Sequence, residues 1–360
     1  AQEGHALSMT RLAQFYTLGL GVEKDAQAAH RWSLAAAQTG NAEAMTQLGK
    51  TLLDPTSPQR DDAQGAAWLE KAVEQNDPAA AIALADCFFR GVGVEKNFGR
   101  AFSLLQSALM QGHKPAALEL GLAHLLYGTT PDDFQKARAH FETAAEHGCT
   151  QAMLQLGGCF LTLGDHEQAF QWFAKGSQRG GGACKLALGL CHELGIGTKQ
   201  SFATAYDCYK DAEQFGQEAA AAYRMGELNR LGLGARKDMK KALHYYRRAK
   251  EQNHPAAFYR LAELFLNGEG VKQNEEKALD LLRKCAPYCP PAALRMIALF
   301  FRKGIFVEKS AALLAHYEAL ADRADLLRFF YGEDASLEHL KNFIGGYRAL
   351  FARFDNAPRD

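Results

Sequence analysis

The sequence predicts an all-α solenoid of about nine two-helix repeats, closed by a C-terminal capping helix. Two observations support this fold class. A small residue that follows Leu, Met or Ile returns about every 36 residues, and a Gly-x-Gly motif returns five times between apolar segments. Self-similarity at such a period is typical of repeat proteins, in which each unit packs mainly against its neighbours.

The first helix of each repeat is marked by a column of small residues, which we call the reference positions. They lie 36 residues apart, except for one interval of 32 and one of 37. A large aliphatic residue precedes each, and a small residue usually lies five positions earlier, so the offsets fall on one helix face. The small side chains let a neighbouring helix approach closely. The reference positions are Ala13, Gly49, Ala85, Gly121, Gly157, Gly189, Gly226, Ala262 and Ala298.

The second helix of each repeat is marked at both ends. Asp, Asn or Ser at its start can cap free backbone N–H groups, and residues four, seven and eleven positions later trace one face. Gly or Asn at its end tolerates the left-handed conformation of a C-terminal cap. The predicted N-caps are Asp25, Asp61, Asn97, Asp133, Asp165, Ser201, Asp238, Asn274 and Ser310. The predicted ends are Gly40, Asn76, Gly112, Gly148, Gly180, Gly216 and Asn253.

The Gly-x-Gly motifs could form phosphate-binding loops or simple turns. They are "GLGV" at 19–22, "GVGV" at 91–94, "GIGT" at 195–198, "GLGA" at 232–235 and "GEGV" at 268–271. None has G-x-G-x-x-G after a strand or G-K-[ST] before a helix, the patterns of nucleotide-binding loops. Near-copies between two helices favour a hairpin turn, in which glycine adopts a positive φ at little cost.

The combined pattern A-x3-LG…G-x-GV…D-x3-A-x2-W…A-x3-G resembles the SEL-one-like repeat (SLR) family, a relative of the tetratricopeptide repeat. The resemblance covers residues 5–322. It implies a right-handed α-α superhelix that presents the first helix of each unit on its concave side. Three units depart from the pattern: "DPTSPQR" at 54–60 and "YGTTP" at 127–131 replace the Gly-x-Gly turn, and the fifth unit is four residues short. We expect these departures to alter local curvature only.

The chain is expected to contain two segments. Residues 1–322 form an array of nine SLR units whose first unit begins near residue 5, and residues 323–360 form a degenerate capping segment. Residues 1–4, "AQEG", match "AQTG" at 37–40, so the chain is expected to start at the end of a preceding repeat, either cut from a longer protein or exposed by processing. An apolar stripe within 336–354 predicts a helix that covers the last repeat. A partner-association or self-association helix is the alternative.

Charge and cysteine usage limit the class of protein. Lys plus Arg and Asp plus Glu each number 41, which argues against general binding to nucleic acid or a membrane surface. No apolar run reaches the roughly 18 residues of a membrane span. Six of the eight cysteines occupy core columns without a regular pair or a C-x2-C motif, so we expect free thiols and no structural zinc. We therefore expect a monomer in a cytoplasmic or other reducing compartment, with an exported effector or a processed periplasmic form as the alternative.

No catalytic constellation stands out from the repeat pattern, so the sequence predicts no catalytic, cofactor-binding or metal-binding residue. His124 and His192 occupy a column that is aromatic in other units, which favours packed histidines over metal ligands. The segment 236–254 is locally basic, with Arg247 and Arg248 outside the apolar stripe. A solvated helix face is favoured there over a patch for an acidic partner or nucleic acid.

These observations predict a non-enzymatic scaffold or adaptor that binds a peptide or protein segment in the concave groove lined by the first helices. The groove positions lie two before, one after and five after each reference position, and they are polar at both ends of the array and apolar in the middle. The alternative is a regulatory or targeting domain of a larger enzyme whose catalytic part lies outside this chain. The resemblance also suggests bacterial signalling or host interaction. The predicted groove residues are Lys50, Asp86, Arg90, Glu119, Leu122, Leu126, Gln155, Leu190, Leu194, Arg224, Glu227, Arg260 and Glu263.

Overall fold

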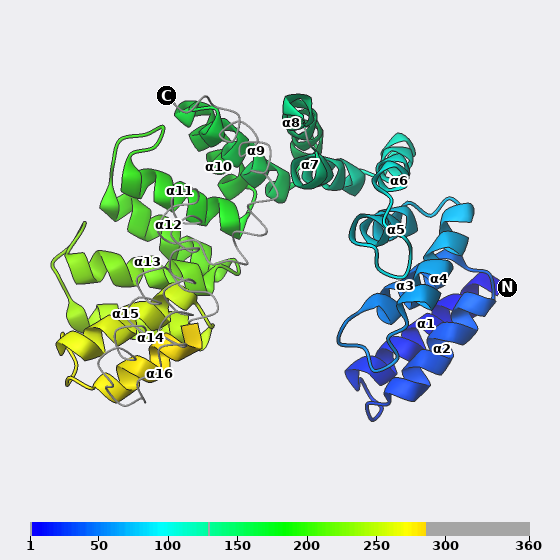
Figure 1. Cartoon of the computed structure of the whole chain (residues 1–360), viewed down its shortest axis with the longest axis horizontal. Helices are drawn as coiled ribbons and strands as arrows, with labels where there is room; N and C mark the ends of the chain where they lie inside the picture. Colours follow the sequence, from blue (N-terminus) through cyan, green and yellow to red (C-terminus); the bar gives the residue numbers. More distant parts are fainter. Residues whose placement is uncertain (1, 129, 286–360) are drawn as a thin grey trace, which may run out of the picture. The chain divides into compact units, whose positions relative to one another are not determined.

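The computed structural model describes residues 2–128 and 130–285, and every regular element in that part of the chain is an α-helix (Figure 1). Two compact units, Ala1–His147 and Gly148–Asp360, are described separately below. Within each unit the helices form consecutive packed pairs, and each pair packs on the next, which is the predicted all-α solenoid of repeats. The ninth predicted repeat and the capping segment 323–360 lie outside the described residues.

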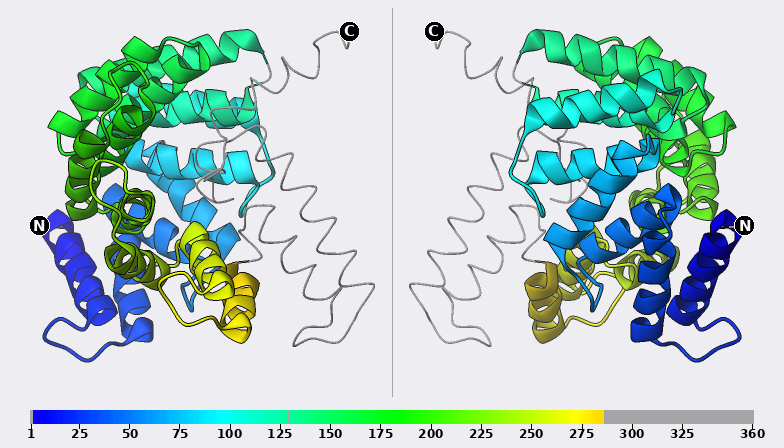
Figure 2. Two further views of the ribbon diagram at one scale, coloured as in Figure 1. Left: turned by 90° about the vertical axis from the view of Figure 1, so that its left-hand side faces the viewer. Right: turned by 90° about the vertical axis from the view of Figure 1, so that its right-hand side faces the viewer.

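The first unit contains four helix pairs, in which the odd-numbered helices are the first helices of the repeats. The pairs are α1 (Gln2–Leu18) with α2 (Ala26–Gln38), α3 (Ala42–Leu53) with α4 (Asp62–Glu74), α5 (Pro78–Arg90) with α6 (Phe98–Met110), and α7 (Pro115–Tyr127) with α8 (Pro131–Glu146). Figure 2 shows these helices, blue to cyan-green, from two further directions. The first helices also contact one another directly, α1 with α3 and α3 with α5. Side chains on their exposed faces therefore come together from successive repeats.

The second unit repeats the arrangement. Its pairs are α9 (Thr150–Thr162) with α10 (His166–Gln178), α11 (Gly182–Leu194) with α12 (Phe202–Gln214), α13 (Glu218–Leu231) with α14 (Met239–Glu251), and α15 (Pro255–Asn267) with α16 (Glu275–Cys285). The first helices α9 and α11 are in direct contact. The short fifth repeat keeps both of its helices, because the missing residues fall in the turn between α9 and α10.

Within the described residues, the second helices begin where the polar caps predict, with one exception; Ser310 lies outside them. Backbone N–H groups of the first turn donate hydrogen bonds of 2.8–3.3 Å to the side chains of Asp25, Asp61, Asn97, Asp165, Ser201, Asp238 and Asn274. The prediction that Asp133 is an N-cap is wrong. Thr130 is the N-cap of α8, and Asp133 accepts a hydrogen bond of 2.9 Å from the Thr130 N–H in a capping box. The helix starts earlier because Pro131 suits the first helical position.

The predicted turns are confirmed by their backbone angles. Among the ends of the second helices, Asn76 and Asn253 have φ angles of 60° and 58°, and the glycines have φ angles of 81° to 88°. Both glycines of every Gly-x-Gly motif have φ angles between 63° and 76°. The second glycine has a further role, because a Cβ at Gly93 would lie 1.9 Å from the carbonyl oxygen of Asp62. The motif therefore both turns the chain and lets the turn contact the preceding repeat.

In the core of several repeats, an aromatic ring from the second helix packs directly against a reference glycine of the first helix. A Cβ at Gly157 would lie 2.1 Å from Cε1 of Phe173, whose side chain is only 2% exposed. Phe141, Tyr209 and Tyr246 lie in the same way against the three other ring-facing glycines, Gly121, Gly189 and Gly226. These rings lie eight positions after the predicted N-cap. The residue seven positions after the N-cap, which the sequence pattern pointed to, lies only partly inside the core in most repeats.

Candidate functional site

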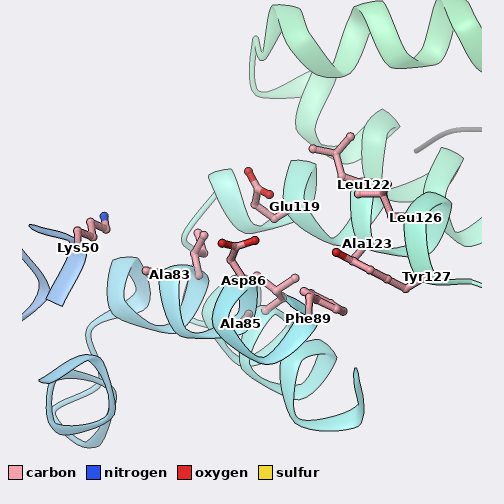
Figure 3. Close-up of a pocket in the computed structure, with 12 residues that line it drawn as sticks. Lys50, Ala83, Ala85, Asp86, Phe89, Glu119, Leu122, Ala123, Leu126 and Tyr127 are labelled. Carbon is pink, nitrogen blue, oxygen red and sulfur yellow. The ribbon is translucent and has the colours of Figure 1, made fainter. Parts of the chain in front are cut away.

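A pocket of about 260 Å³ opens on the first-helix side of the first unit, mainly between α3, α5 and α7 (Figure 3). Five of the thirteen predicted groove residues line it. These are Lys50, Asp86, Glu119, Leu122 and Leu126. They come from three consecutive repeats, because the same positions of successive first helices face the same side. The remaining lining residues are Ile82, Ala83, Ala85, Phe89, Leu105, Ala123 and Tyr127.

One end of the pocket is formed by an aromatic cluster that includes Phe89 and Tyr127. The rings of Phe89 and Tyr127 stack with centroids 4.5 Å apart and planes 4° from parallel. Phe98 lies against Tyr127 at 5.2 Å, and Phe102 meets the edge of Phe89 at 5.3 Å. Neither Phe89 nor Tyr127 was predicted from the sequence to line the groove. The segment "YGTTP" at 127–131 could have indicated them, because it replaces the first glycine of the turn with Tyr127, at which α7 ends.

The polar part of the pocket is built from carboxylates. Glu119 on α7 and Asp86 on α5 lie next to each other in Figure 3, while Lys50 on α3 lies apart from Glu119. Burial raises the pKa of Glu119, and the negative charge of Asp86 raises it further. Arg90, the sixth predicted groove residue of this unit, donates to Asp86 at 3.0 Å, and both side chains of that pair are more than half exposed.

The predicted groove residues of the second unit form a polar network instead of a pocket lining. Glu227 on α13 accepts hydrogen bonds from Arg230 at 2.9 Å, from Arg260 of α15 at 2.8 Å and from the hydroxyl of Tyr246. Arg260 also donates to Glu263 on its own helix. Burial acts to raise the pKa of Glu227, but the hydrogen bond from Arg230 and the charge of Arg260 outweigh it and lower the pKa.

The other predicted groove residues of this unit have mixed environments. Arg224 lies 3.6 Å from Glu193, and Gln155 is buried. Leu190 is half-buried and packs against the core cluster that contains Tyr209, whereas Leu194 is 62% exposed. Leu194 is therefore the better position at which to test for contact with a partner, because a change there leaves the core intact.

The two singled-out histidines contact aromatic rings. His124 Nδ1 lies 3.1 Å from Asp133, and its ring stacks on His140 at a centroid distance of 5.6 Å. His192 meets Phe170 edge to face at 5.4 Å. Across the described part of the chain, no group of three or more His, Cys, Asp or Glu side chains is placed to hold a metal ion. Both histidines thus have the environment expected of packed side chains.

The basic segment lies on α14. Arg247 is exposed, while Arg248 pairs with Glu213 of α12. Lys241 is also exposed and lies near the N-cap residue Asp238. The outer face of α14 thus combines exposed cations with a cross-repeat ion pair.

Of the six cysteines whose side chains are described, five lie in core columns and Cys149 lies in the turn before α9. Cys87, Cys159, Cys184 and Cys191 are buried, Cys149 and Cys208 are half-buried, and no disulfide joins these six. Burial raises the pKa of Cys87 and of Cys184 to about 11 and that of Cys191 to about 12. A thiolate is the nucleophilic and metal-binding form of cysteine. These thiols therefore remain protonated and unreactive at neutral pH.

The fold and the repeated caps define a two-helix repeat protein. The chain belongs to the Sel1 repeat family, whose model matches it eight times, at residues 6–41, 42–77, 78–113, 114–149, 150–181, 182–212, 219–254 and 255–286. This confirms the resemblance seen in the sequence. The match at 150–181 covers the shortened fifth repeat. Comparison with curated proteins gave no match.

Solved structures support the same fold. The crystal structure of c5321, described as a protective antigen of uropathogenic Escherichia coli with an SLR fold, is 23% identical with a TM-score of 0.57, and the match covers 98% of this chain and 89% of that one. A Sel1 repeat protein from Oxalobacter formigenes is 24% identical with a TM-score of 0.58, and the match covers 82% of this chain and 86% of that one. Sel1 repeats are generally a non-catalytic fold for binding other proteins. Among the described residues, no helix has both the length and the apolar composition needed to cross a membrane.

Proposed function

We propose that this chain is a non-enzymatic scaffold or adaptor that binds a peptide or protein segment along the first-helix face of its repeats. The observation that carries the proposal is the pocket of the first unit. Groove positions from three consecutive repeats, represented by Lys50, Asp86 and Glu119, line one open cavity with apolar walls. Repeat proteins use such surfaces, which extend across neighbouring units, to bind extended or helical segments.

The apolar wall is the natural anchor point for such a segment. Leu122 and Leu126 occupy groove positions that are polar in most other repeats, and both are half-buried at the pocket. Their neighbours Phe89 and Tyr127 are fixed by stacking, so the wall is already formed before a partner binds. A preformed apolar wall lowers the ordering cost of binding. We therefore expect the partner to place an apolar side chain against Leu126.

Peptide selection tests the proposal. Random dodecapeptides displayed on phage would be selected on the full chain, and the enriched peptides measured by fluorescence anisotropy. We expect Leu126→Ser to weaken their binding about tenfold or more, since truncation of a well-packed anchor removes on the order of 1.4 kcal/mol or more. Met110→Ser is the matched control, because Met110 is 84% exposed and lies outside the pocket.

Two further measurements make the outcome decisive. Circular dichroism of each variant shows that the helices are retained, and Leu122→Ser provides a second change in the same wall. Leu194→Ser tests whether the same peptides also contact the second unit. Selected peptides that bind the Leu126 and Leu122 variants as tightly as the Met110 control would contradict the proposed site.

A further inference from the structure

Glu119 and Asp86 occupy the same two repeat positions as the residues of an ion pair elsewhere in the chain. Glu119 lies two residues before a reference position and Asp86 lies one residue after the preceding one. Arg260 and Glu227 have the same two offsets in the second unit. There the register produces an ion pair, with Arg260 Nε 2.8 Å from Glu227 Oε1. In the first unit the same register brings two carboxylates together.

No described residue of the first unit supplies a cation to Glu119. Within the described part of the chain, no hydrogen bond or ion pair joins Glu119 to another residue, and its pKa is raised by burial and by Asp86. Arg90 pairs with Asp86 along the exposed surface of α5, and such pairs contribute little. Lys50 has Ala83, not a carboxylate, at the corresponding position of the next repeat. Glu119 is half-buried, and a partly desolvated carboxylate without a cation favours a partner that brings one.

We propose that the pocket recognises an arginine side chain of the bound segment, with its guanidinium between Asp86 and Glu119 and its methylene groups along Leu122. This inference rests on the proposed function and names the chemistry of the partner. Arg260 shows that the repeat framework suits this arrangement, because its guanidinium donates to both Glu227 and Glu263. A planar guanidinium carries five N–H donors and can serve two carboxylates at once, which an ammonium does less well.

The peptides selected on the full chain provide the first test. We expect the enriched sequences to contain an arginine close to an apolar residue, since the two carboxylates lie beside the Leu122–Leu126 wall. Replacement of that arginine by citrulline keeps the shape of the side chain and removes its charge. We expect the peptide affinity to fall at least about tenfold, as for the loss of a charge-assisted hydrogen bond.

Variants of the chain provide the second test. Glu119→Arg would place an arginine at the repeat position equivalent to that of Arg260, so that the pocket itself supplies a cation beside Asp86. We expect this variant to melt at a higher temperature than the wild type and to lose the arginine-dependent peptides. Gln47→Arg is the matched control, because Gln47 has the same offset in the second repeat and its register neighbour is Gln14. We expect no comparable stabilisation and no loss of binding from the control.

The outcomes separate this inference from the proposed function. Peptides that depend on Leu126 but tolerate both citrulline and Glu119→Arg would overturn the arginine inference and leave the groove proposal standing. Peptides that do not depend on Leu126 or Leu122 would overturn both. Equal melting temperatures for Glu119→Arg and Gln47→Arg would refute the idea that Asp86 and Glu119 require a cation. Loss of binding with citrulline, together with stabilisation by Glu119→Arg, supports it.

Discussion

Substitution of Gly157 by alanine tests whether the repeat core depends on contact between a ring and a glycine. The new Cβ would lie 2.1 Å from Cε1 of Phe173 and 2.5 Å from its Cδ1 and Cζ atoms. Phe173 is only 2% exposed, so its ring has little room to move away. Alanine improves helix propensity by about 1 kcal/mol, whereas overpacking costs about 1–3 kcal/mol or more. Because a contact of 2.1 Å puts the overpacking cost at the upper end of its range, we expect a net loss of about 2 kcal/mol in the free energy of unfolding.

The sequence itself suggests the compensating change. Two other repeats have alanine at the reference position and leucine at the ring position, as in the pair Ala85 and Leu105. Phe173→Leu alone leaves a cavity and should cost on the order of 1–2 kcal/mol. In the double variant Gly157→Ala with Phe173→Leu, the methyl group fills part of that cavity. We expect the double variant to be more stable than the sum of the single changes by at least about 1 kcal/mol.

Urea unfolding followed by circular dichroism measures the cycle. Gly99→Ala is the matched control, since Gly99 lies exposed in the first turn of α6 and a Cβ there meets no atom closer than 3.6 Å. We expect the control to be neutral or stabilising by up to about 1 kcal/mol. Strictly additive single and double variants, or a Gly157→Ala protein as stable as the Gly99→Ala control, would refute the packing argument.

Two further predictions follow from the pKa shifts. Glu119 has a raised pKa in the folded chain, so its contribution to stability is present at low pH and is lost as the pH rises through that pKa, whereas Glu227 has a lowered pKa and its contribution is lost as the pH falls. In melting curves from about pH 3 to pH 8, Glu119→Gln should therefore gain stability relative to the wild type as the pH rises, and Glu227→Gln should lose it, mainly below the ordinary glutamate pKa of about 4.3; parallel curves for the two variants would contradict the assignment. Because burial raises the pKa of Cys87 and Cys191 to about 11 and 12, these thiols should resist a disulfide reagent at pH 8 in the folded chain and react after denaturation, and rapid modification without unfolding would place them on the surface.

Most of the fold could be predicted from the sequence, because its determinants are local. A polar cap such as Asn97 acts within one helical turn, and a glycine such as Gly40 is required by its own backbone angle. Both signals can be recognised in a single sequence, without comparison to other sequences. The wrong N-cap prediction, Asp133, shows the limit of such local signals. Thr130 and Asp133 lie three residues apart, and either could cap the same helix. Pro131, which suits the first helical position, favours the earlier start at Thr130.

The candidate site could be predicted only in part, because it depends on contacts between repeats. Offsets from the reference positions predicted Asp86, Glu119 and Leu122 as residues of one groove, and the structure places all three in the lining of one pocket. The same offsets gave no indication that Phe89 and Tyr127 would stack and close one end of the pocket. A groove residue is either paired within the chain or free to contact a partner, depending on the residue that faces it from the next repeat, about 33 positions away.

The two acidic positions Asp86 and Glu227 illustrate how one framework can serve stability or binding. Each lies one residue after a reference position and faces the residue 33 positions later. At Glu227 that residue is an arginine, and the carboxylate is neutralised within the chain. At Asp86 it is Glu119, and folding brings two like charges together beside an apolar wall. If the proposed arginine site is correct, such a pair weakens the unbound fold and a cationic partner relieves it, so stability given up in the free chain becomes affinity in the complex. In such a repeat protein, we therefore expect binding residues at the positions where the usual ion pair between repeats is missing.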